Sequence, residues 1–329
     1  MRWPQQLSNP ASRHKDEGDP VESNAWSESG QWCNIAAMSE SIRTVTVLGA
    51  GTMGSGIAQV SAMAGLATRL FDVDSAALNR GLDRALAQVA EGVRRGKIPA
   101  GTDERAGRSL AGIPDLKEAV AGADLVIEAA PERMELKTEI FRTLSTLCSG
   151  SAILASNTSS LSLTEMAAAA TNPGRVVGLH FFNPPHIMRL VEIVSAQQTT
   201  AATLQSARDF VAAIGKEPIT VRDSPGFATS RLGLALGLEA MRMVEQGVAS
   251  ASDIDRAMEL GYGHPMGPLK VSDLVGLDVR LAIAEILHRE LGGEQFRAPV
   301  ILRRLVRAGK LGRKSGEGFH RWDDPVKPS

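Results

Sequence analysis

Short apolar runs alternate with longer stretches of helical periodicity through the first two thirds of the chain. Runs rich in Val, Ile and Leu are typical of strands that are covered on both faces, as in a parallel sheet. Stretches whose apolar residues recur every three or four positions predict helices. The expected strands are 44–49, 67–72, 123–130, 151–157, 175–182, 189–194 and 217–223, and the expected helices are 53–65, 75–96, 133–148, 162–170 and 200–214. This alternation predicts a doubly wound, mostly parallel α/β sheet.

The pattern changes after Pro225 and Gly226. Strand-like runs end there, and Leu, Ala and Met at helical spacing predict helices over 227–247, 253–260, 269–291 and 298–309. We therefore expect an α/β domain over residues 38–224, followed by an all-helical C-terminal domain over residues 225–329.

Residues 1–37 differ in composition from everything that follows. They carry three of the four tryptophans, several prolines and no helical or alternating period. Their acidic residues argue against a mitochondrial transit peptide, and the absence of a long apolar block argues against a secretory signal. We expect a disordered extension that is not part of the fold, with Met38 as the natural start.

The bulk composition excludes several classes of protein. The net charge of −1 gives no argument for binding nucleic acid or an anionic membrane, and no run approaches the roughly 18 apolar residues of a membrane span. Cys33 and Cys148 are the only cysteines, too few for a disulfide framework or a Cys-rich zinc site. We expect a cytoplasmic protein without a bound metal.

The segment from Gly49 to Gly54 has the spacing G-x-G-x-x-G between an expected strand and an expected helix. The first glycine permits the turn, the second lets the backbone approach a pyrophosphate, and the third allows close packing of strand and helix. The helix N-terminus, with Thr52 and Met53, faces the anion. Asp72 ends the next expected strand, where a carboxylate would bond the ribose hydroxyls and repel a 2′-phosphate. The sequence therefore predicts a Rossmann-like site that favours NAD over NADP, although FAD-binding proteins share the fingerprint.

A dehydrogenase needs a base that accepts the hydroxyl proton as the hydride leaves. Tyr262 is the only tyrosine and no lysine stands four residues after it, which excludes short-chain dehydrogenase chemistry. His180 ends an apolar run at the edge where α/β sheets place ligands. Glu192 lies in the next apolar run, and a carboxylate buried there needs a partner such as an imidazole. We predict a His180–Glu192 pair; a structural histidine with an unrelated, half-exposed glutamate is the alternative.

Separated motifs along the chain resemble the L-3-hydroxyacyl-CoA dehydrogenase family. They are VTVLGAGTMGSGIAQ, ADLVIEAAPE, ASNTSSLSLTEMA, GLHFFNPPHIMRLVEIV, DSPGF, GHPMGPL and LGRKSGEGF, in order from about Arg43 to Trp322. In its short, single-function form the chain resembles the bacterial 3-hydroxybutyryl-CoA dehydrogenases. The resemblance implies a Rossmann-like NAD domain and a helical domain that covers the substrate and forms a homodimer.

The resemblance also implies roles for the matching positions. His180 matches the catalytic base, Glu192 its acidic partner, and Ser159 the serine that contacts both substrate and nicotinamide. Asn183 matches an asparagine that contacts substrate and cofactor. The expected cofactor contacts are Gly49, Gly51, Thr52, Met53, Gly54, Asp72, Glu132, Lys137, Ser159, Asn183 and, from the helical domain, Lys314.

Two features depart from the family pattern. The family commonly has an asparagine near the reacting carbon where this chain has Ser230, which is shorter and lacks the amide geometry. A donor of this kind is worth about 3 kcal/mol, so Ser230 is expected to affect activity or chain-length preference. Gln88 and Arg95 fall where the family contacts CoA, but a basic run on a helix is equally typical of a solvated face.

These observations predict reversible, NAD-dependent oxidation of an (S)-3-hydroxyacyl-CoA, in particular 3-hydroxybutyryl-CoA, in fatty acid or butanoate metabolism. The expected partners are the acyl-CoA substrate and a second copy of the chain. Two alternatives stay open from the sequence. One is a related, gulonate-type dehydrogenase acting on a free hydroxy acid, which Ser230 and the partly matched CoA helix favour. The other is a dinucleotide-binding protein without turnover.

Overall fold

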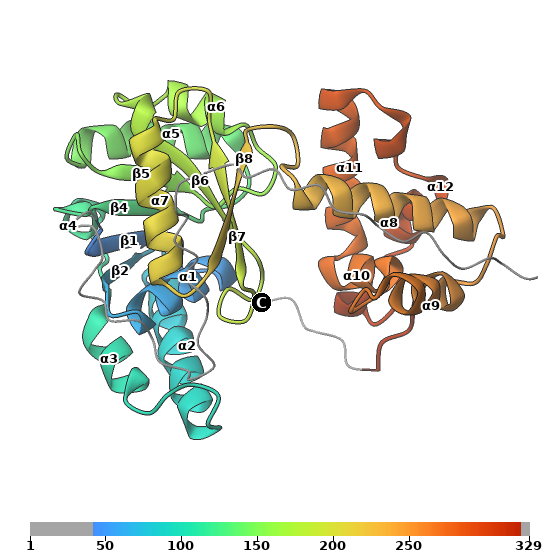
Figure 1. Ribbon diagram of the computed structural model, residues 1–329, viewed down its shortest axis with the longest axis horizontal. Helices are drawn as coiled ribbons and strands as arrows, with labels where there is room; N and C mark the ends of the chain where they lie inside the picture. Colours follow the sequence, from blue (N-terminus) through green and yellow to red (C-terminus); the bar gives the residue numbers. More distant parts are fainter. Residues whose placement is uncertain (1–41, 324–329) are drawn as a thin grey trace, which may run out of the picture. The chain divides into compact units, whose positions relative to one another are not determined.

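The computed structural model describes residues 42–323, and the extension expected over residues 1–37 lies outside this range. The first part of the described chain is a single eight-stranded sheet with helices between its strands (Figure 1). The strands are β1 (Thr44–Leu48), β2 (Ala67–Phe71), β3 (Leu110–Gly112), β4 (Leu125–Glu128), β5 (Ile153–Ser156), β6 (Val176–Phe181), β7 (Leu190–Ser195) and β8 (Glu217–Arg222). They lie in the order β3-β2-β1-β4-β5-β6-β7-β8. Every neighbouring pair is parallel except β6 and β7, which confirms the doubly wound, mostly parallel class.

Helices cover both faces of the sheet. They are α1 (Thr52–Met63), α2 (Ser75–Arg94), α3 (Thr102–Ser109), α4 (Leu116–Val120), α5 (Met134–Leu147), α6 (Leu163–Ala168) and α7 (Ala201–Ala213). Successive side chains of a strand point to opposite faces, and β4 shows the result. Ile127 packs in one core with Ile57 of α1, whereas Val126 packs in another with Phe141 of α5. Burial on both faces explains why these strands read as continuous apolar runs.

From residue 229 to residue 309 the regular structure is helical, in agreement with the predicted all-helical region (Figure 1). The helices are α8 (Thr229–Glu245), α9 (Ala251–Tyr262), α10 (Pro268–Val275), α11 (Leu277–Leu291) and α12 (Val300–Arg307). They share a core of their own, which includes Leu234, Leu269 and Leu287. Single 3-10 turns lie at Pro173–Arg175, Glu294–Phe296 and Arg313–Ser315.

Two sequence expectations were wrong in detail. The single helix expected over 269–291 is two helices, because Gly276 adopts φ 102°, a conformation that ends α10 before α11 begins. The strand β3 was missed because it has only three residues, Leu110–Gly112, too few for a periodic signal.

Candidate functional site

The parallel strands bring most of the predicted site residues to one edge of the sheet. Asp72 follows β2, Gly49 follows β1, Glu132 follows β4 and Ser159 follows β5, while His180 is the fifth residue of β6. These five strands run in the same direction and lie side by side in the order β2-β1-β4-β5-β6. Residues far apart in the sequence therefore lie along the carboxyl edge, where open α/β sheets bind their ligands.

The glycine loop has the geometry that a dinucleotide pyrophosphate requires. Gly49 adopts φ 97°, and a Cβ there would lie 2.7 Å from the carbonyl oxygen of Ala129. A Cβ on Gly54 would lie 1.8 Å from the carbonyl oxygen of Gly49, so helix and loop can approach this closely only because residue 54 has no side chain. A Cβ on Gly51 would meet nothing within 4 Å. The loop thus leaves open space just ahead of α1, whose N-terminal amides attract an anion, and these residues fit NAD.

Asp72 is held beside this loop. Its Oδ2 accepts a hydrogen bond of 2.7 Å from the backbone N–H of Ala50, and its Oδ1 accepts one of 3.0 Å from Asp74. The carboxylate is half-buried at the end of β2. Its position next to the glycine loop is the one the sequence predicts for the residue that meets a ribose.

An ionic network, buried at Lys137 and Glu128, links the ends of β4 and β5. The Lys137 side chain, 1% exposed, donates to Glu128 Oε1 at 2.7 Å and lies 3.3 Å from Glu132. Glu132 Oε1 also accepts from Thr158 Oγ1 at 2.6 Å and from the backbone of Ser159 at 2.9 Å. Burial alone would raise the pKa of Glu132, but Lys137 and these hydrogen bonds outweigh it and hold the pKa below its usual range. The network fixes the loop that carries Ser159.

His180 and Glu192 form the predicted pair. They are directly opposite in the antiparallel register of β6 and β7, and His180 Nδ1 lies 2.7 Å from Glu192 Oε2. Both residues are buried. The rings of Phe182 and Phe227 lie 4.5 and 5.8 Å from the imidazole, between centroids. An imidazole held at Nδ1 by a carboxylate presents Nε2 for proton transfer.

Glu192 also joins the sheet to the first helix of the helical region. Its Oε1 accepts from the backbone of Ala228 at 3.2 Å and of Thr229 at 2.9 Å, and its Oε2 accepts from Thr229 Oγ1 at 2.9 Å. Burial raises the pKa of Glu192, but the hydrogen bonds from His180 and Thr229 prevail and lower it overall. The carboxylate therefore stays ionised while fully enclosed, and it caps the start of α8.

The remaining predicted residues are not joined to this pair by a hydrogen bond. Ser230 is half-buried as the second residue of α8, next to Thr229, and Asn183 is exposed just beyond β6. Lys314 Nζ donates to Asp278 Oδ2 at 2.7 Å within the helical region. Gln88 and Arg95 are exposed along α2, and Arg95 pairs with Glu91, as Arg94 does. The roles of all these residues stay predictions.

Three residues of the site were missed. Glu128 is the last residue of the apolar strand β4, and an acidic residue in an apolar run is the same signal that predicted Glu192. Thr229 and Thr158 bond the key carboxylates through hydroxyl groups, for which a single sequence carries no distinctive signal.

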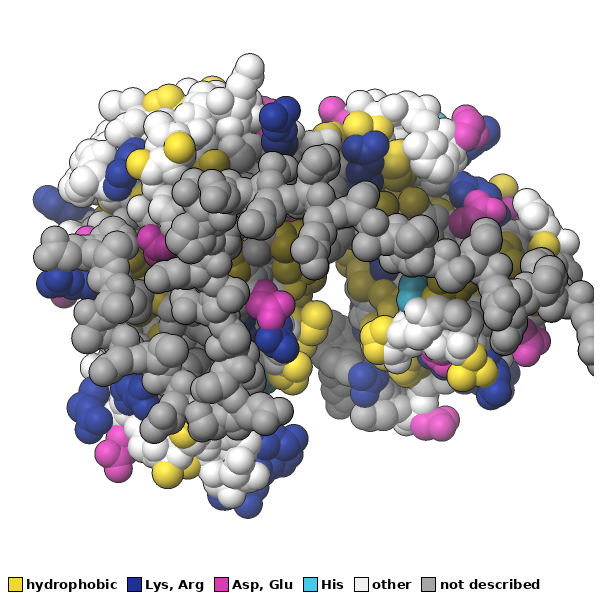
Figure 2. Space-filling model, viewed as in Figure 1, with side chains coloured by type: hydrophobic (Ala, Val, Ile, Leu, Met, Phe, Trp, Pro, Cys, Tyr) yellow, Lys and Arg dark blue, Asp and Glu magenta, His cyan; other side chains and the backbone are white. Residues whose placement is uncertain are grey.

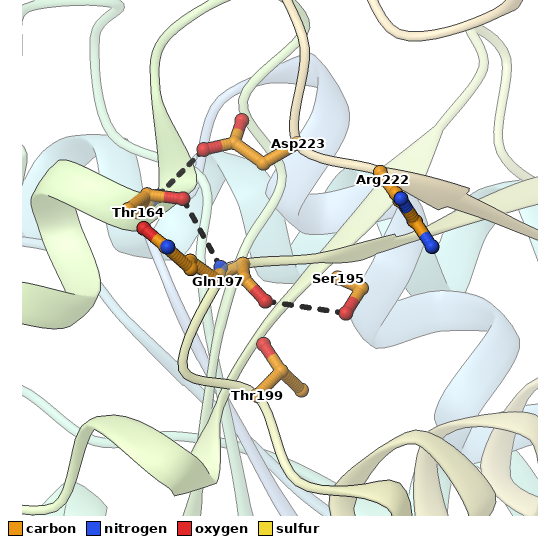
Figure 3. Close-up of a pocket in the computed structure, with 7 residues that line it drawn as sticks. Thr164, Ser195, Gln197, Thr199, Arg222 and Asp223 are labelled. Carbon is orange, nitrogen blue, oxygen red and sulfur yellow. Dashed lines mark hydrogen bonds between the residues drawn. The ribbon is translucent and has the colours of Figure 1, made fainter.

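The described residues were also compared with the requirements of a metal site, a membrane span and a second pocket. Among residues 42–323 no cluster of three His, Cys, Asp or Glu side chains fits a metal ion. No helix in the same range is long and apolar enough to span a membrane. A polar hollow of about 460 Å³, lined by Thr164, Ser195, Ala196, Gln197, Thr199, Arg222 and Asp223, contains none of the predicted residues (Figure 3). Its Asp223 accepts from the backbone of Thr164 at 2.7 Å and holds the start of α6.

A glycine loop at the carboxyl edge of a doubly wound sheet, together with a buried His–Glu pair, is typical of nicotinamide-dependent dehydrogenases. Comparison with known proteins identifies which ones. Residues 44–224 match the family model for the NAD binding domain of 3-hydroxyacyl-CoA dehydrogenase, and residues 226–322 match the model for its C-terminal domain. The chain therefore belongs to the 3-hydroxyacyl-CoA dehydrogenase family, and it is an NAD-dependent oxidoreductase.

Individual relatives of the chain agree with this family assignment. The chain is 43% identical over 283 residues to a probable 3-hydroxybutyryl-CoA dehydrogenase of Bacillus subtilis, covering 86% of this chain and 98% of the relative. It is 42% identical to the 3-hydroxyadipyl-CoA dehydrogenase of Escherichia coli over 85% of this chain and 59% of that longer relative. The crystal structure of an (S)-3-hydroxybutyryl-CoA dehydrogenase from Ralstonia eutropha matches with a TM-score of 0.83 and 38% identity, covering 86% of this chain and all of that one.

Proposed function

We propose that the protein interconverts (S)-3-hydroxybutyryl-CoA and acetoacetyl-CoA with NAD as the cofactor, in fatty acid or butanoate metabolism. The observation that carries the proposal is the buried His180–Glu192 pair at the carboxyl edge of the sheet. The names of the relatives include both a 3-hydroxybutyryl-CoA and a 3-hydroxyadipyl-CoA dehydrogenase. The choice of the shorter acyl chain therefore rests on the general similarity between this chain and the 3-hydroxybutyryl-CoA dehydrogenases.

In the proposed reaction each residue acts at a defined atom. NAD⁺ supplies the hydride acceptor when it is bound. His180 takes the hydroxyl proton at Nε2, the ring nitrogen that Glu192 does not engage. Glu192 fixes the imidazole tautomer and stabilises the positive charge that forms on the ring. Ser159 and Ser230 orient the oxygen of the substrate by hydrogen bonds.

We also propose that the remaining predicted contacts serve binding. Lys314 and Asn183 would reach the cofactor, and Gln88 and Arg95 would contact CoA from α2. Asp72 would select NAD, because its carboxylate beside the glycine loop repels a 2′-phosphate. The proposed domain division, at residues 38–224 and 225–329, places Ser230 and Lys314 in the helical domain.

A spectrophotometric assay tests the reaction and the cofactor together. NADH oxidation is followed with acetoacetyl-CoA, and NADPH is tested in parallel. We expect rapid turnover with NADH and at least about 10-fold lower kcat/KM with NADPH, since one unfavourable charge contact readily exceeds 1.4 kcal/mol. Equal use of NADPH would contradict the role of Asp72, and tight NADH binding without turnover would identify a non-catalytic dinucleotide-binding protein.

Free acetoacetate serves as the second substrate in that assay. The second candidate function is oxidation of a free hydroxy acid, favoured by Ser230 and by the ion pairs of Arg94 and Arg95 with Glu91, which occupy basic groups that a CoA phosphate would need. Turnover of acetoacetate without turnover of acetoacetyl-CoA would establish that candidate and overturn the main proposal.

We further propose a homodimer formed through the helical domain. Leu232 and Leu236 lie one turn apart on α8 and are 71% and 37% exposed, and Val275 and Val279 are exposed nearby in sequence on α10 and α11. Figure 2 shows hydrophobic side chains at the surface of the helical region as well. Exposed apolar residues of this kind are typical of subunit contacts. Light scattering coupled to size exclusion should give twice the chain mass; a monomer at all concentrations would contradict it.

A further inference from the structure

Arg280 is the one buried charged side chain in residues 42–323 without an ionic or hydrogen-bonding partner. The residue lies in the first turns of α11 and is 6% exposed, and its Nε is enclosed without an acceptor. The other buried charged residues in this range are bonded: Glu128 to Lys137, Glu192 to His180, Asp255 to His320 and Asp273 to Trp322. Burial lowers the pKa of Arg280 to about 10, so the guanidinium is still a cation at neutral pH.

An enclosed charge without a counter-ion is unfavourable for the folded protein. Removing one partner of a buried ion pair is strongly destabilising, which indicates how costly a lone buried charge is. A ligand that supplies the missing charge would offset this cost. A guanidinium is suited to a carboxylate, which it binds through two parallel hydrogen bonds.

The surroundings of Arg280 contain space for such a ligand. Gly233 lies on α8, and a Cβ built there would come within 3.9 Å of Arg280 Nη1 and of no other atom within 4 Å. The absent side chain therefore leaves an open volume that the guanidinium borders. Nη1 is the guanidinium atom that borders this volume, whereas Nε is enclosed.

This volume lies close to the N-terminal end of α8, which contacts the His180–Glu192 pair. Gly233 is four residues after Thr229, whose hydroxyl and N–H bond the Glu192 of the catalytic pair. Residues four apart share a helix face and are separated by about one 5.4 Å turn. Ser230, shorter than the asparagine common in the family, lies between them on neighbouring turns. Ser230 and Gly233 therefore carry little or no side chain along the stretch of α8 between Thr229 and the cation.

We propose that Arg280 is a specificity residue that binds the carboxylate at the far end of the acyl chain of a 3-hydroxyacyl-CoA. The inference rests on the dehydrogenase reaction proposed above, because it takes the hydroxyl-bearing carbon to lie at His180, but it extends the acyl chain from butyryl to a longer chain that ends in a carboxylate. A methyl-ended acyl chain offers the guanidinium no partner, whereas a dicarboxylic acyl chain completes an ion pair. The phosphates of CoA are a less suitable anion, because the basic residue expected to meet them, Arg95, lies at the C-terminal end of α2 in the sheet region.

The test compares two substrates of equal chain length. We expect the wild-type protein to reduce 3-oxoadipyl-CoA with a kcat/KM at least about 10-fold above that for 3-oxohexanoyl-CoA, as a charge-assisted hydrogen-bond pair provides. This ratio needs no variant. Arg280→Gln should bring the ratio close to one, and Arg280→Lys should keep part of it. Arg289→Gln, an exposed arginine of the same helix, should leave the ratio unchanged.

Three results would overturn the proposal. The first is a wild-type ratio near one with both substrates reduced, which would leave the dehydrogenase function intact and remove only the carboxylate site. The second is a wild-type ratio that Arg280→Gln leaves unchanged. The third is a change of oligomeric state in Arg280→Gln with the ratio unaltered, which would assign Arg280 to a subunit contact. If no 3-oxoacyl-CoA is reduced, the proposed function itself fails, and this inference fails with it.

Discussion

Glu192 accepts four hydrogen bonds while fully buried. An ionised carboxylate without such donors would be strongly unfavourable in this position. The donors are the imidazole of His180, two backbone amides at the start of α8, and the hydroxyl of Thr229. Together they keep the carboxylate charged and fixed, so that it can hold the imidazole in one orientation. The hydroxyl is the only one of these donors, apart from His180, that a side-chain substitution can remove.

Thr229→Val tests that hydroxyl. A hydrogen bond to a charged group is worth about 1.5–3 kcal/mol, so we expect kcat for acetoacetyl-CoA to fall about 10-fold or more. The dissociation constant for NADH should not change, because Thr229 contacts no part of the predicted cofactor site. Thr229→Ser keeps the hydroxyl and should restore most of kcat. A valine variant within twofold of the wild type would show that Thr229 does not position the pair.

The sequence predicted the His180–Glu192 pair but not the other residues that hydrogen-bond to Glu192. His180 and Glu192 were recognisable because each interrupts an apolar run with a titratable group, and antiparallel register then placed them opposite each other. Thr229 contributes through a contact of 37 positions' separation, which no local pattern encodes. The burial of Arg280 could likewise not be predicted, since an arginine on a helix is ordinarily solvated.

At the scale of elements, Lys137 attaches α5 to the end of β4. It is 1% exposed between Glu128 and Glu132, so its removal leaves carboxylates without their counter-ion. We expect Lys137→Met to lower the free energy of unfolding by about 3–5 kcal/mol, measured by urea denaturation. Lys117→Met, at an exposed position of α4, is the matched control and should change it by less than about 0.5 kcal/mol. Equal effects of the two substitutions would contradict the structural role of Lys137.

The sequence predicted the boundaries of helices and strands wherever the hydrophobic period and the backbone preferences of the residues agreed. The long strands and helices of the sheet region were predicted to within a few residues. The prediction failed at Gly276, where a single φ of 102° divides a continuous helical pattern, and at β3, where three residues pair with β2. Both failures reflect tertiary constraints that periodicity does not contain.

At the scale of the whole molecule, Glu192 couples acid stability to the contact between β7 and α8. Its folded-state pKa lies below the usual value, so its stabilising contribution is present above the unfolded-state pKa of about 4.3. That contribution is lost as the pH falls through the lower, folded-state pKa. We therefore expect the wild-type free energy of unfolding to decrease from pH 5 downward more than that of Glu192→Gln.

Denaturant titrations at a series of acidic pH values measure this difference. Glu104→Gln, which removes a carboxylate whose side chain is 74% exposed, should follow the wild-type curve. A Glu192→Gln curve with the same pH slope as the wild type would show that Glu192 is not the linked group.

The central claim is that His180 is the base of a 3-hydroxyacyl-CoA dehydrogenase. Its most direct test is the turnover of acetoacetyl-CoA with NADH by His180→Gln, measured beside the dissociation constant for NADH. General acid–base catalysis contributes about 10²- to 10⁴-fold, so kcat should fall by that factor while NADH binding is kept. Turnover close to the wild-type rate, with NADH binding unchanged, would contradict the account.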